Sequence, residues 1–324
     1  MIKTRVTEIL GIKYPIILAA MQWISRAELV AAASNAGGMG IIASLTFPTV
    51  AELREEIKKT KSLTDKPFAV NVTLIPTARP VNYEEYFIAA IEEGVKIVET
   101  SGRSPEPYMK LLKDAGVTVM HRATRTRDIR TAERVGVDIA TIIGYEAAGL
   151  IGMEDTTALV RIPAAVDAVK IPVVAAGGIV DARGFVAALA LGAEGVLIGT
   201  RFMLSKECYI HPKIKEWLLQ VGEANTTLVQ RSINNPNRVA KTDFAQMVLE
   251  MEGRKATLEE LLPFISGLRQ RDAYASGDFN SAVISVSQAI GLMHDIPSVK
   301  DIIEGIAAEA RVIMRRLHSE GIDS

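Results

Sequence analysis

The sequence contains a single cysteine, Cys208, in 324 residues. A lone thiol excludes an internal disulfide framework, and the lack of cysteine pairs excludes a structural zinc site. No apolar run approaches the roughly 20 residues that a membrane-spanning helix needs. The first 21 residues carry charge and lack the apolar core and cleavage site of a signal peptide. We therefore expect a cytoplasmic protein with no metal site and no membrane segment.

An excess of charge of either sign is also missing, because 37 basic residues are balanced by 38 acidic ones and the formal net charge is −1. Binding to nucleic acid or to an acidic membrane usually depends on a basic field that this chain lacks. The expected partner is a small-molecule substrate. A homo-oligomer is compatible with the sequence, which does not specify the oligomeric state.

What the sequence does contain is a regular alternation of short apolar runs with segments of helical periodicity. The runs are rich in β-branched residues and show no polar alternation, which is typical of parallel strands buried on both faces. There are eight of them, at residues 15–20, 39–43, 68–72, 95–99, 117–121, 139–143, 172–176 and 195–198.

Helical segments separate these runs, and several of them end in glycine, the residue best suited to the left-handed conformation that stops a helix. The glycines are Gly37, Gly94, Gly116, Gly136 and Gly192. Asp181 is placed to begin the last of these helices. The predicted helices span residues 27–36, 50–61, 83–93, 105–115, 126–135, 158–169 and 182–191.

Eight strands alternating with helices in about 200 residues predict an α/β fold, a (β/α)8 TIM barrel, with a doubly wound open sheet as the alternative. After residue 200 the alternation stops, and residues 207–291 are expected to form helices and loops without buried strands. A long amphipathic helix at 298–318 would pack against the barrel or over its open end. We therefore assign residues 1–204 and 292–324 to the barrel, and residues 205–291 to a helical lid, called the lid below.

Ligands of a parallel barrel bind where the strands end, at the C-terminal face called the mouth below. The residues that follow the runs are mostly small or hydrogen-bonding, which favours a large polar ligand contacted by backbone amides, hydroxyls and side-chain amides. Gly177-Gly178 and Gly199-Thr200 follow the seventh and eighth runs, where such barrels bind phosphate. A simple turn is the alternative for the glycine pair.

Several motifs occur in a defined order along the chain: PIILAAMQWISRAELVAAASNAGGMG, FAVNVTL, VETSG, VMHRATRTRDIRTAERVGVD, GYEAAGLIG and VVAAGGIVDARGFVAALALGAEGVLIGTRFM. Together they resemble the nitronate monooxygenase family, also called 2-nitropropane dioxygenases, which includes NADH:quinone reductases and flavin-type enoyl thioester reductases. RSINNPNRVAKT and SGLRQRDAYASGDFNSAVISVSQAIGL are similar to the lid of the quinone-reductase branch. The resemblance covers essentially the whole chain and implies a barrel that holds FMN at its mouth.

The resemblance also implies roles for individual residues. Ala20, Met21 and Gln22 would line the flavin ring, and Asn71 and Thr73 would approach its polar edge. A cation near that edge, supplied by Arg122, would stabilise the reduced anion. Packing or a turn is the competing explanation for each residue taken alone. The ribityl chain and the phosphate would be held by Gly149, Gly177, Gly178, Gly199 and Thr200.

The loop after the sixth run departs from the family pattern. Relatives carry a histidine where this sequence has Leu150. A histidine at this substrate-facing position can act as a base on a neutral nitroalkane or donate a hydrogen bond to a substrate, and leucine can do neither. Proton abstraction is therefore in doubt, whereas oxidation of a preformed nitronate and hydride transfer from a nicotinamide to FMN need no base.

Four other residues are weaker candidates for the site. His121 ends the fifth run and could face the flavin as a catalytic group, with a buried structural histidine as the alternative. Tyr145, Trp23 and Tyr274 could supply aromatic surface to a flat substrate. Core packing is the competing explanation for all three aromatic residues.

These observations predict an FMN-dependent oxidoreductase that oxidises nitronate-like small molecules through the flavin with O2. In the alternative reaction, NAD(P)H is a co-substrate that reduces FMN, and a quinone or an enoyl thioester accepts the electrons. A non-catalytic flavin-binding protein would also fit the replacement at Leu150. A flavin-free isomerase of a phosphorylated metabolite would need a carboxylate base at a strand end, and the sequence presents no convincing one.

Overall fold

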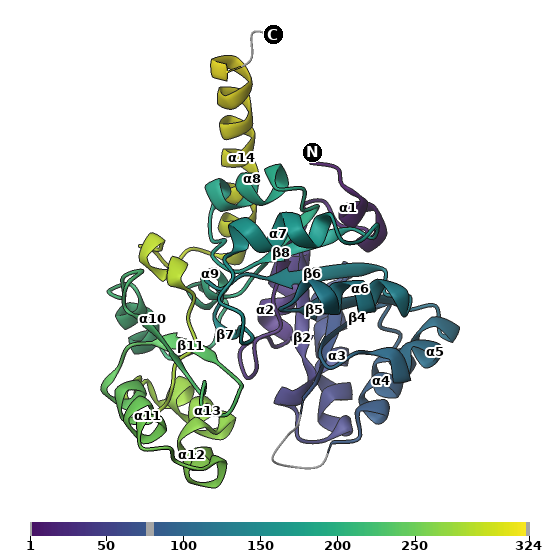
Figure 1. Cartoon of the computed structure of the whole chain (residues 1–324). Helices are drawn as coiled ribbons and strands as arrows, with labels where there is room; N and C mark the ends of the chain where they lie inside the picture. Colours follow the sequence, from purple (N-terminus) through teal and green to yellow (C-terminus); the bar gives the residue numbers. More distant parts are fainter. Residues whose placement is uncertain (1, 76–80, 322–324) are drawn as a thin grey trace.

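The computed structural model describes residues 2–75 and 81–321. Within them, eight parallel strands form a closed barrel in the order β1-β2-β3-β4-β5-β6-β8-β9, with helices outside (Figure 1). The ring closes because β1 pairs with β9 as well as with β2, which confirms the predicted barrel over the open sheet. The strands are β1 Ile16–Leu18, β2 Met39–Ala43, β3 Ala69–Leu74, β4 Ile97–Gly102, β5 Thr118–Ala123, β6 Ile139–Ile143, β8 Val173–Ala176 and β9 Gly195–Ile198.

The helices around the barrel begin and end close to the predicted positions. Each of the five glycines expected to end a helix has a positive φ, between +68° and +93°. Two short helical segments, η1 Ser44–Thr46 and α9 Thr200–Met203, follow β2 and β9. The longer helices are α2 Ala27–Asn35, α3 Val50–Leu63, α4 Tyr83–Glu92, α5 Glu106–Asp114, α6 Thr126–Arg134, α7 Ala158–Val166 and α8 Ala182–Ala190.

A short N-terminal helix, α1 Arg5–Leu10, closes the end of the barrel opposite the mouth. Its Val6 and Leu10 pack in the same apolar cluster as interior residues of the strands. Gly195, at the start of β9, lies so close to Val6 that an added Cβ would stand 3.3 Å from the valine side chain. The sequence analysis did not predict this helix.

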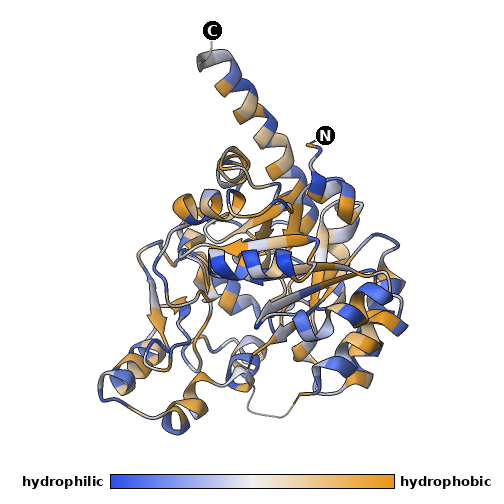
Figure 2. Cartoon of the chain, turned by 45° about the vertical axis from the view of Figure 1, so that its right-hand side comes forward, coloured by the Kyte–Doolittle hydropathy of each residue, from blue (hydrophilic) through white to orange (hydrophobic). Residues whose placement is uncertain are grey.

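The barrel interior changes from apolar to polar toward the mouth. Ala69, Ile97, Met120 and Ile139 belong to the interior apolar cluster. Because side chains two positions apart in a strand point the same way, the residues two positions further along these four strands also face the interior. Figure 2 shows apolar strands surrounded by helices with polar and apolar stripes. The interior residues two positions after the four apolar ones, nearer the mouth, are polar: Asn71, Glu99, Arg122 and Thr141.

The C-terminal part contains a small antiparallel sheet as well as helices. β10 Thr226–Val229 pairs with β11 Asn237–Ala240, which pairs in turn with β7 Gly149–Leu150 from the loop after β6. The expectation of helices and loops alone is therefore wrong here. Both lid strands are four residues long and contain polar residues, so neither has the apolar run that marks a barrel strand. The other elements are α10 Pro212–Leu218, α11 Asp243–Gly253, α12 Leu258–Ile265, α13 Gly267–Ser276 and η2 Gln288–Leu292.

The last helix, α14 Val299–Gly321, corresponds to the amphipathic helix predicted at 298–318. It packs along α8 and α2, on the side of the barrel rather than over the mouth. Its C-terminal half extends beyond the rest of the molecule in both views (Figures 1 and 2). Among the described residues, no helix combines the length and apolar character needed to cross a membrane.

Candidate active site

Loops from distant parts of the chain meet at the mouth. A Cβ added to Gly199, after β9, would lie 3.5 Å from the Sδ atom of Met21, after β1. The backbone amide of Ser287 donates to the Thr200 hydroxyl over 3.1 Å, and the Ser287 hydroxyl donates to the carbonyl of Glu146 over 2.8 Å. The segment before η2 therefore joins the loop after β6 to the loop after β9.

The glycine pair after β8 has a conformation and a packing that exclude side chains. Gly177 has φ +97° and Gly178 has φ +74°, both in the left-handed region. A Cβ at Gly177 would stand 3.0 Å from the carbonyl oxygen of Gly144, and one at Gly178 would stand 3.2 Å from Cβ of Glu146. The positive φ and the tight packing against the loop after β6 together favour glycine at both positions.

The helix start after this glycine pair is already capped. As the sequence predicts, Asp181 begins α8, and its carboxylate accepts hydrogen bonds from the backbone amides of Arg183 and Gly184. An anion at this point would therefore depend on the glycine turn and on the start of α9, not on the first turn of α8. Thr200 is buried, and in the described residues its hydroxyl accepts a hydrogen bond but donates none. Its proton is thus left for another acceptor.

A polar cluster lies on the opposite side of the mouth, at the ends of β3, β4 and β5. The Asn71 amide donates to Oε2 of Glu99 over 2.7 Å, the Thr73 hydroxyl donates to Oδ1 of Asn71 over 2.7 Å, and the Ser101 hydroxyl donates to Thr73 over 3.0 Å. Nη2 of Arg122 lies 3.8 Å from Oε2 of Glu99. These five residues, called the polar cluster below, include two residues that the sequence analysis did not single out, Glu99 and Ser101.

Glu99 is the most unusual member of the polar cluster. Its side chain is fully buried, and its Oε1 atom has no hydrogen-bond partner among the described residues. Burial raises the pKa of this carboxyl group, while Arg122 and the Asn71 hydrogen bond act in the opposite direction. The sequence analysis found no convincing carboxylate base at a strand end and did not single out Glu99, which is buried within β4. A single acidic residue closing an otherwise apolar run was the signal.

A second buried polar atom faces the same interior. The hydroxyl of Thr141, on β6, has no hydrogen-bond partner within the described part of the chain. Buried polar groups are normally paired, so unpaired ones are places where a ligand or water can complete the bonding. Thr141 is in register with Arg122 on the neighbouring strand. Both unpaired atoms thus lie on the polar, mouth-side part of the barrel interior.

His121 is next to Arg122 in sequence but points the other way. Val119 packs in the outer cluster between barrel and helices, and by strand alternation His121 shares that outer face. Its Nδ1 lies 2.9 Å from the Thr100 hydroxyl. Burial lowers the pKa of His121 to about 4, so the ring is neutral near pH 7. The structure therefore does not bring His121 together with the polar cluster, and the structural alternative fits it better.

Leu150 lies at the junction of barrel and lid. It pairs with Asn237 of β11, and its side chain is 36% exposed. The preceding Gly149, at φ +74°, pairs with Arg238. The guanidinium of Arg238 donates two hydrogen bonds to the carbonyl of Tyr145 and lies 4.5 Å from the centre of the tyrosine ring. One face of Tyr145 is thus covered by the lid.

The two other aromatic candidates have different surroundings. Trp23 has φ +68°, unusual for a residue with a side chain, and its amide donates to the Thr46 hydroxyl over 2.9 Å. A Cβ on Gly267, at the start of α13, would lie 3.2 Å from Oε1 of Gln22 and 3.5 Å from the indole nitrogen of Trp23. The loop after β1 therefore touches the lid. Tyr274 is buried in the main core, which fits the packing alternative.

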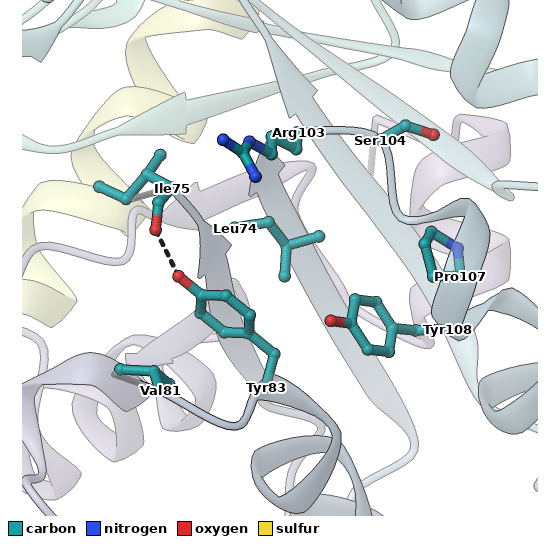
Figure 3. Close-up of a pocket in the computed structure, with 8 residues that line it drawn as sticks. All are labelled: Leu74, Ile75, Val81, Tyr83, Arg103, Ser104, Pro107 and Tyr108. Carbon is teal, nitrogen blue, oxygen red and sulfur yellow. Dashed lines mark hydrogen bonds between the residues drawn. The ribbon is translucent and has the colours of Figure 1, made fainter. Parts of the chain in front are cut away.

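A separate pocket of about 350 Å³ lies behind the ends of β3 and β4 (Figure 3). Tyr83 and Tyr108 line it, and the Tyr83 hydroxyl donates to the carbonyl of Ile75. Leu74, also in its wall, packs in the outer cluster and so faces away from the barrel interior. The pocket was not predicted, and β3 and β4 separate it from the polar cluster.

The described residues offer neither a metal site nor a reactive thiol. Within residues 2–75 and 81–321, no set of three histidine, cysteine, aspartate or glutamate side chains is arranged to hold a metal ion. Cys208 is buried, and burial raises the pKa of its thiol to about 11. At neutral pH the thiol is therefore protonated, which makes it a poor nucleophile.

Comparison with known proteins identifies the family. The family model described as nitronate monooxygenase matches residues 3–309. A protein of Rhodococcus jostii (strain RHA1) named (3aS,4S,5R,7aS)-5-hydroxy-7a-methyl-1-oxo-octahydro-1H-indene-4-carboxyl-CoA dehydrogenase is 33% identical, with 95% of this chain and 96% of the relative aligned. A probable nitronate monooxygenase of Staphylococcus saprophyticus is 31% identical over 97% of this chain and 99% of the relative.

A solved structure gives the same result. FabK from Thermotoga maritima superposes with a TM-score of 0.91 at 36% sequence identity and covers 98% of this chain and 99% of its own. The similar proteins thus carry different names for one fold, and the reaction differs among them more than the barrel does. The matches extend over the barrel and the lid together. The chain belongs to the nitronate monooxygenase family and is an oxidoreductase.

Proposed function

We propose that this protein is an FMN-dependent oxidoreductase that oxidises nitronate-like small molecules and passes the electrons to O2. The observation that carries the proposal is the pairing of two features at one end of an apolar barrel. Glycine loops after β8 and β9 form one side of the mouth, and the polar cluster forms the other. A large ligand with an anionic end and a polar ring matches this arrangement.

The residues at the mouth fit FMN. Gly177 and Gly178 form a turn of positive φ that packs tightly against the loop after β6, and the Thr200 hydroxyl has a proton to donate to a phosphate oxygen. Gly199 and Gly149 belong to the same side of the proposed site. On the other side, the unpaired atoms of Glu99 and Thr141 mark an interior whose polar bonding is incomplete without a ligand.

Bound FMN would supply the two-electron chemistry. Arg122, with a side chain that is 16% exposed, would place its cation at the polar edge of the ring, where negative charge develops on reduction. Asn71 already uses its amide hydrogens toward Glu99 and Ser101, so it would offer the remaining lone pair of its carbonyl oxygen. Ala20, Met21 and Gln22, in the loop after β1, would cover the ring.

The proposal of a nitronate substrate rests on Leu150 and His121, neither of which can act as a base at the mouth. Leu150 cannot accept a proton, and His121 faces the outer layer with its pKa lowered to about 4. A substrate that arrives as an anion, with its proton already removed, needs neither group. Leu150 and the exposed face of Tyr145 would provide apolar surface for the substrate, together with Trp23. The lid, residues 205–291, would exclude water from this space through its contacts with the loops after β1 and β6.

A second reaction is favoured by the comparisons. The similarity to FabK over nearly the whole chain, and to a dehydrogenase named for a CoA substrate, supports reduction of a thioester or a quinone by NAD(P)H. Hydride transfer between two cofactors needs no side-chain base, so Leu150 is compatible with this reaction too.

Anaerobic spectroscopy of the purified protein tests the proposal. NADH, NADPH and propyl-2-nitronate are added separately to the flavin-bound form, and the visible bands are followed. Bleaching only by the nitronate supports the leading proposal, and bleaching by a nicotinamide supports the reductase. A protein that is colourless and cannot be reconstituted with FMN would disprove both.

A further inference from the structure

A buried acid lies directly beneath the polar edge of the mouth. Glu99 is on β4, fully buried, and in register with Asn71 of β3. Its Oε2 atom accepts the Asn71 amide over 2.7 Å and lies 3.8 Å from Nη2 of Arg122. One carboxylate oxygen thus contacts both residues that face the mouth, while the other has no partner among the described residues.

The contact with Asn71 determines which way its amide points. Nδ2 donates to Glu99 and, over 3.4 Å, to the Ser101 hydroxyl, whereas Oδ1 accepts from the Thr73 hydroxyl. A flipped amide would place its oxygen against the Glu99 carboxylate and would remove the acceptor of the Thr73 hydroxyl. Glu99 therefore fixes the orientation of Asn71.

The contact with Arg122 changes the charge at the mouth. An ionised and fully buried carboxylate 3.8 Å from a guanidinium offsets much of the positive potential that the guanidinium would otherwise project. The guanidinium is partly exposed and the carboxylate is not. The strength of the cation at the mouth therefore depends on the protonation state of a fully buried carboxyl group.

We propose that Glu99 is a positioning residue that orients Asn71 and weakens the field of Arg122, and so keeps the reduction potential of bound flavin low. This inference depends on the proposed FMN site. When Glu99 is ionised, its charge opposes the formation of a reduced, anionic flavin. When Glu99 is protonated, Arg122 acts alone and the flavin is more easily reduced.

The effect should depend on pH. Arg122 is the charged group that faces Glu99 from β5, Asn71 faces it from β3 without charge, and His121 lies on the outer face of the barrel. Burial raises the pKa of Glu99 above its ordinary value. In the wild type, the carboxylate is therefore ionised at high pH and becomes neutral as the pH falls through this raised pKa.

The test is the midpoint potential of FMN in the holoprotein, measured against indicator dyes from low to high pH. Glu99→Gln keeps the shape and removes the charge, so its potential should be more positive than wild type at high pH and should converge with it as the pH falls. Glu28→Gln, which removes an exposed carboxylate paired with Lys59, is the matched control and should leave the curve unchanged. Identical curves for wild type and Glu99→Gln, or a difference that does not depend on pH, would overturn the inference.

A second variant applies the same test if Glu99→Gln does not retain flavin. Arg122→Gln removes the cation that favours ionised Glu99. The plot of midpoint potential against pH changes slope where Glu99 titrates, so in this variant the change should occur at higher pH. If the slope changes at the same pH as in the wild type, the proposed interaction between Arg122 and Glu99 is wrong. Failure of the wild-type protein itself to bind FMN would instead disprove the proposed function.

Discussion

The β3–β5 side of the mouth is lined by polar side chains, whereas the β8–β9 side is formed by glycine loops. On the first side, Asn71, Glu99 and Arg122 are held by strand register and by hydrogen bonds between their side chains. On the second side, Gly177 and Gly178 have positive φ and pack tightly against the loop after β6. Substitutions on the first side should change the chemistry of a bound cofactor, and substitutions on the second should prevent its binding.

The largest expected effect is on the backbone side. Gly178→Asp places a Cβ 3.2 Å from Glu146, at φ +74°, and adds a negative charge where a phosphate would bind. We expect loss of FMN, measured by the flavin absorbance of the purified protein.

Gly116→Asp is the matched control for this variant. It has a similar φ of +68°, nothing lies within 4 Å of its added Cβ, and it precedes β5 at the end opposite the mouth. The control carries the same backbone strain, about 1–2 kcal/mol, without the proposed phosphate. Full FMN occupancy in Gly178→Asp would disprove this placement of the phosphate.

The next effect tests the junction of barrel and lid. Leu150→His introduces the histidine that the family resemblance implies for this position and supplies a base, and general-base catalysis contributes on the order of 100-fold or more. We expect kcat/KM for neutral nitroethane to increase by about that factor, with little change for the nitronate. Leu150→Asn, similar in size but not basic, should not show the increase. Unchanged rates in Leu150→His with intact FMN would reject this position as the missing base.

A third prediction contrasts the two faces of β5. Burial lowers the pKa of His121 to about 4, below its unfolded value of 6.5, so the unfolded chain binds a proton that the folded chain resists. The folded state should therefore lose about 2 kcal/mol from this group between pH 7 and pH 5. His121→Gln should reduce the pH dependence of the free energy of unfolding, measured by urea denaturation at both pH values. Because His121 faces the outer layer, the flavin spectrum should not change; a large spectral change would place the ring at the mouth.

The smallest effect concerns one hydroxyl on the backbone side. Thr200→Val removes the acceptor of the Ser287 amide and the proposed phosphate donor, and leaves a buried amide unpaired. The loss should weaken FMN binding by about fivefold, because one hydrogen bond contributes roughly 1 kcal/mol. Thr200→Ser keeps the hydroxyl and should bind FMN like the wild type. Equal dissociation constants for Val and Ser, measured by fluorescence titration, would exclude this contact.

The barrel was predictable because its signal is local and repeated. A strand buried on both faces needs an uninterrupted apolar run, and β2, β6 and β9 have the predicted bounds. Glycines after helices and Asp181 before α8 mark boundaries by backbone conformation and capping, which depend on only a few neighbouring residues. The lid strands escaped prediction because β10 and β11 mix polar with apolar residues. In addition, β11 pairs with a two-residue strand nearly 90 positions earlier in the chain, where Asn237 lies opposite Leu150.

The candidate site shows the same division. The sequence by itself determined which residues follow the strands, and so located Asn71, Arg122 and the glycine loops at one end of the barrel. Only the tertiary structure decided that Glu99 faces inward beneath Arg122 while His121 faces outward, and that Ser287 joins two loops at the mouth. The physical reason is the distance along the chain between the residues that specify each feature. Apolar runs and helix caps are specified by adjacent residues, whereas the partner of a buried charge is specified by strand register around a closed barrel.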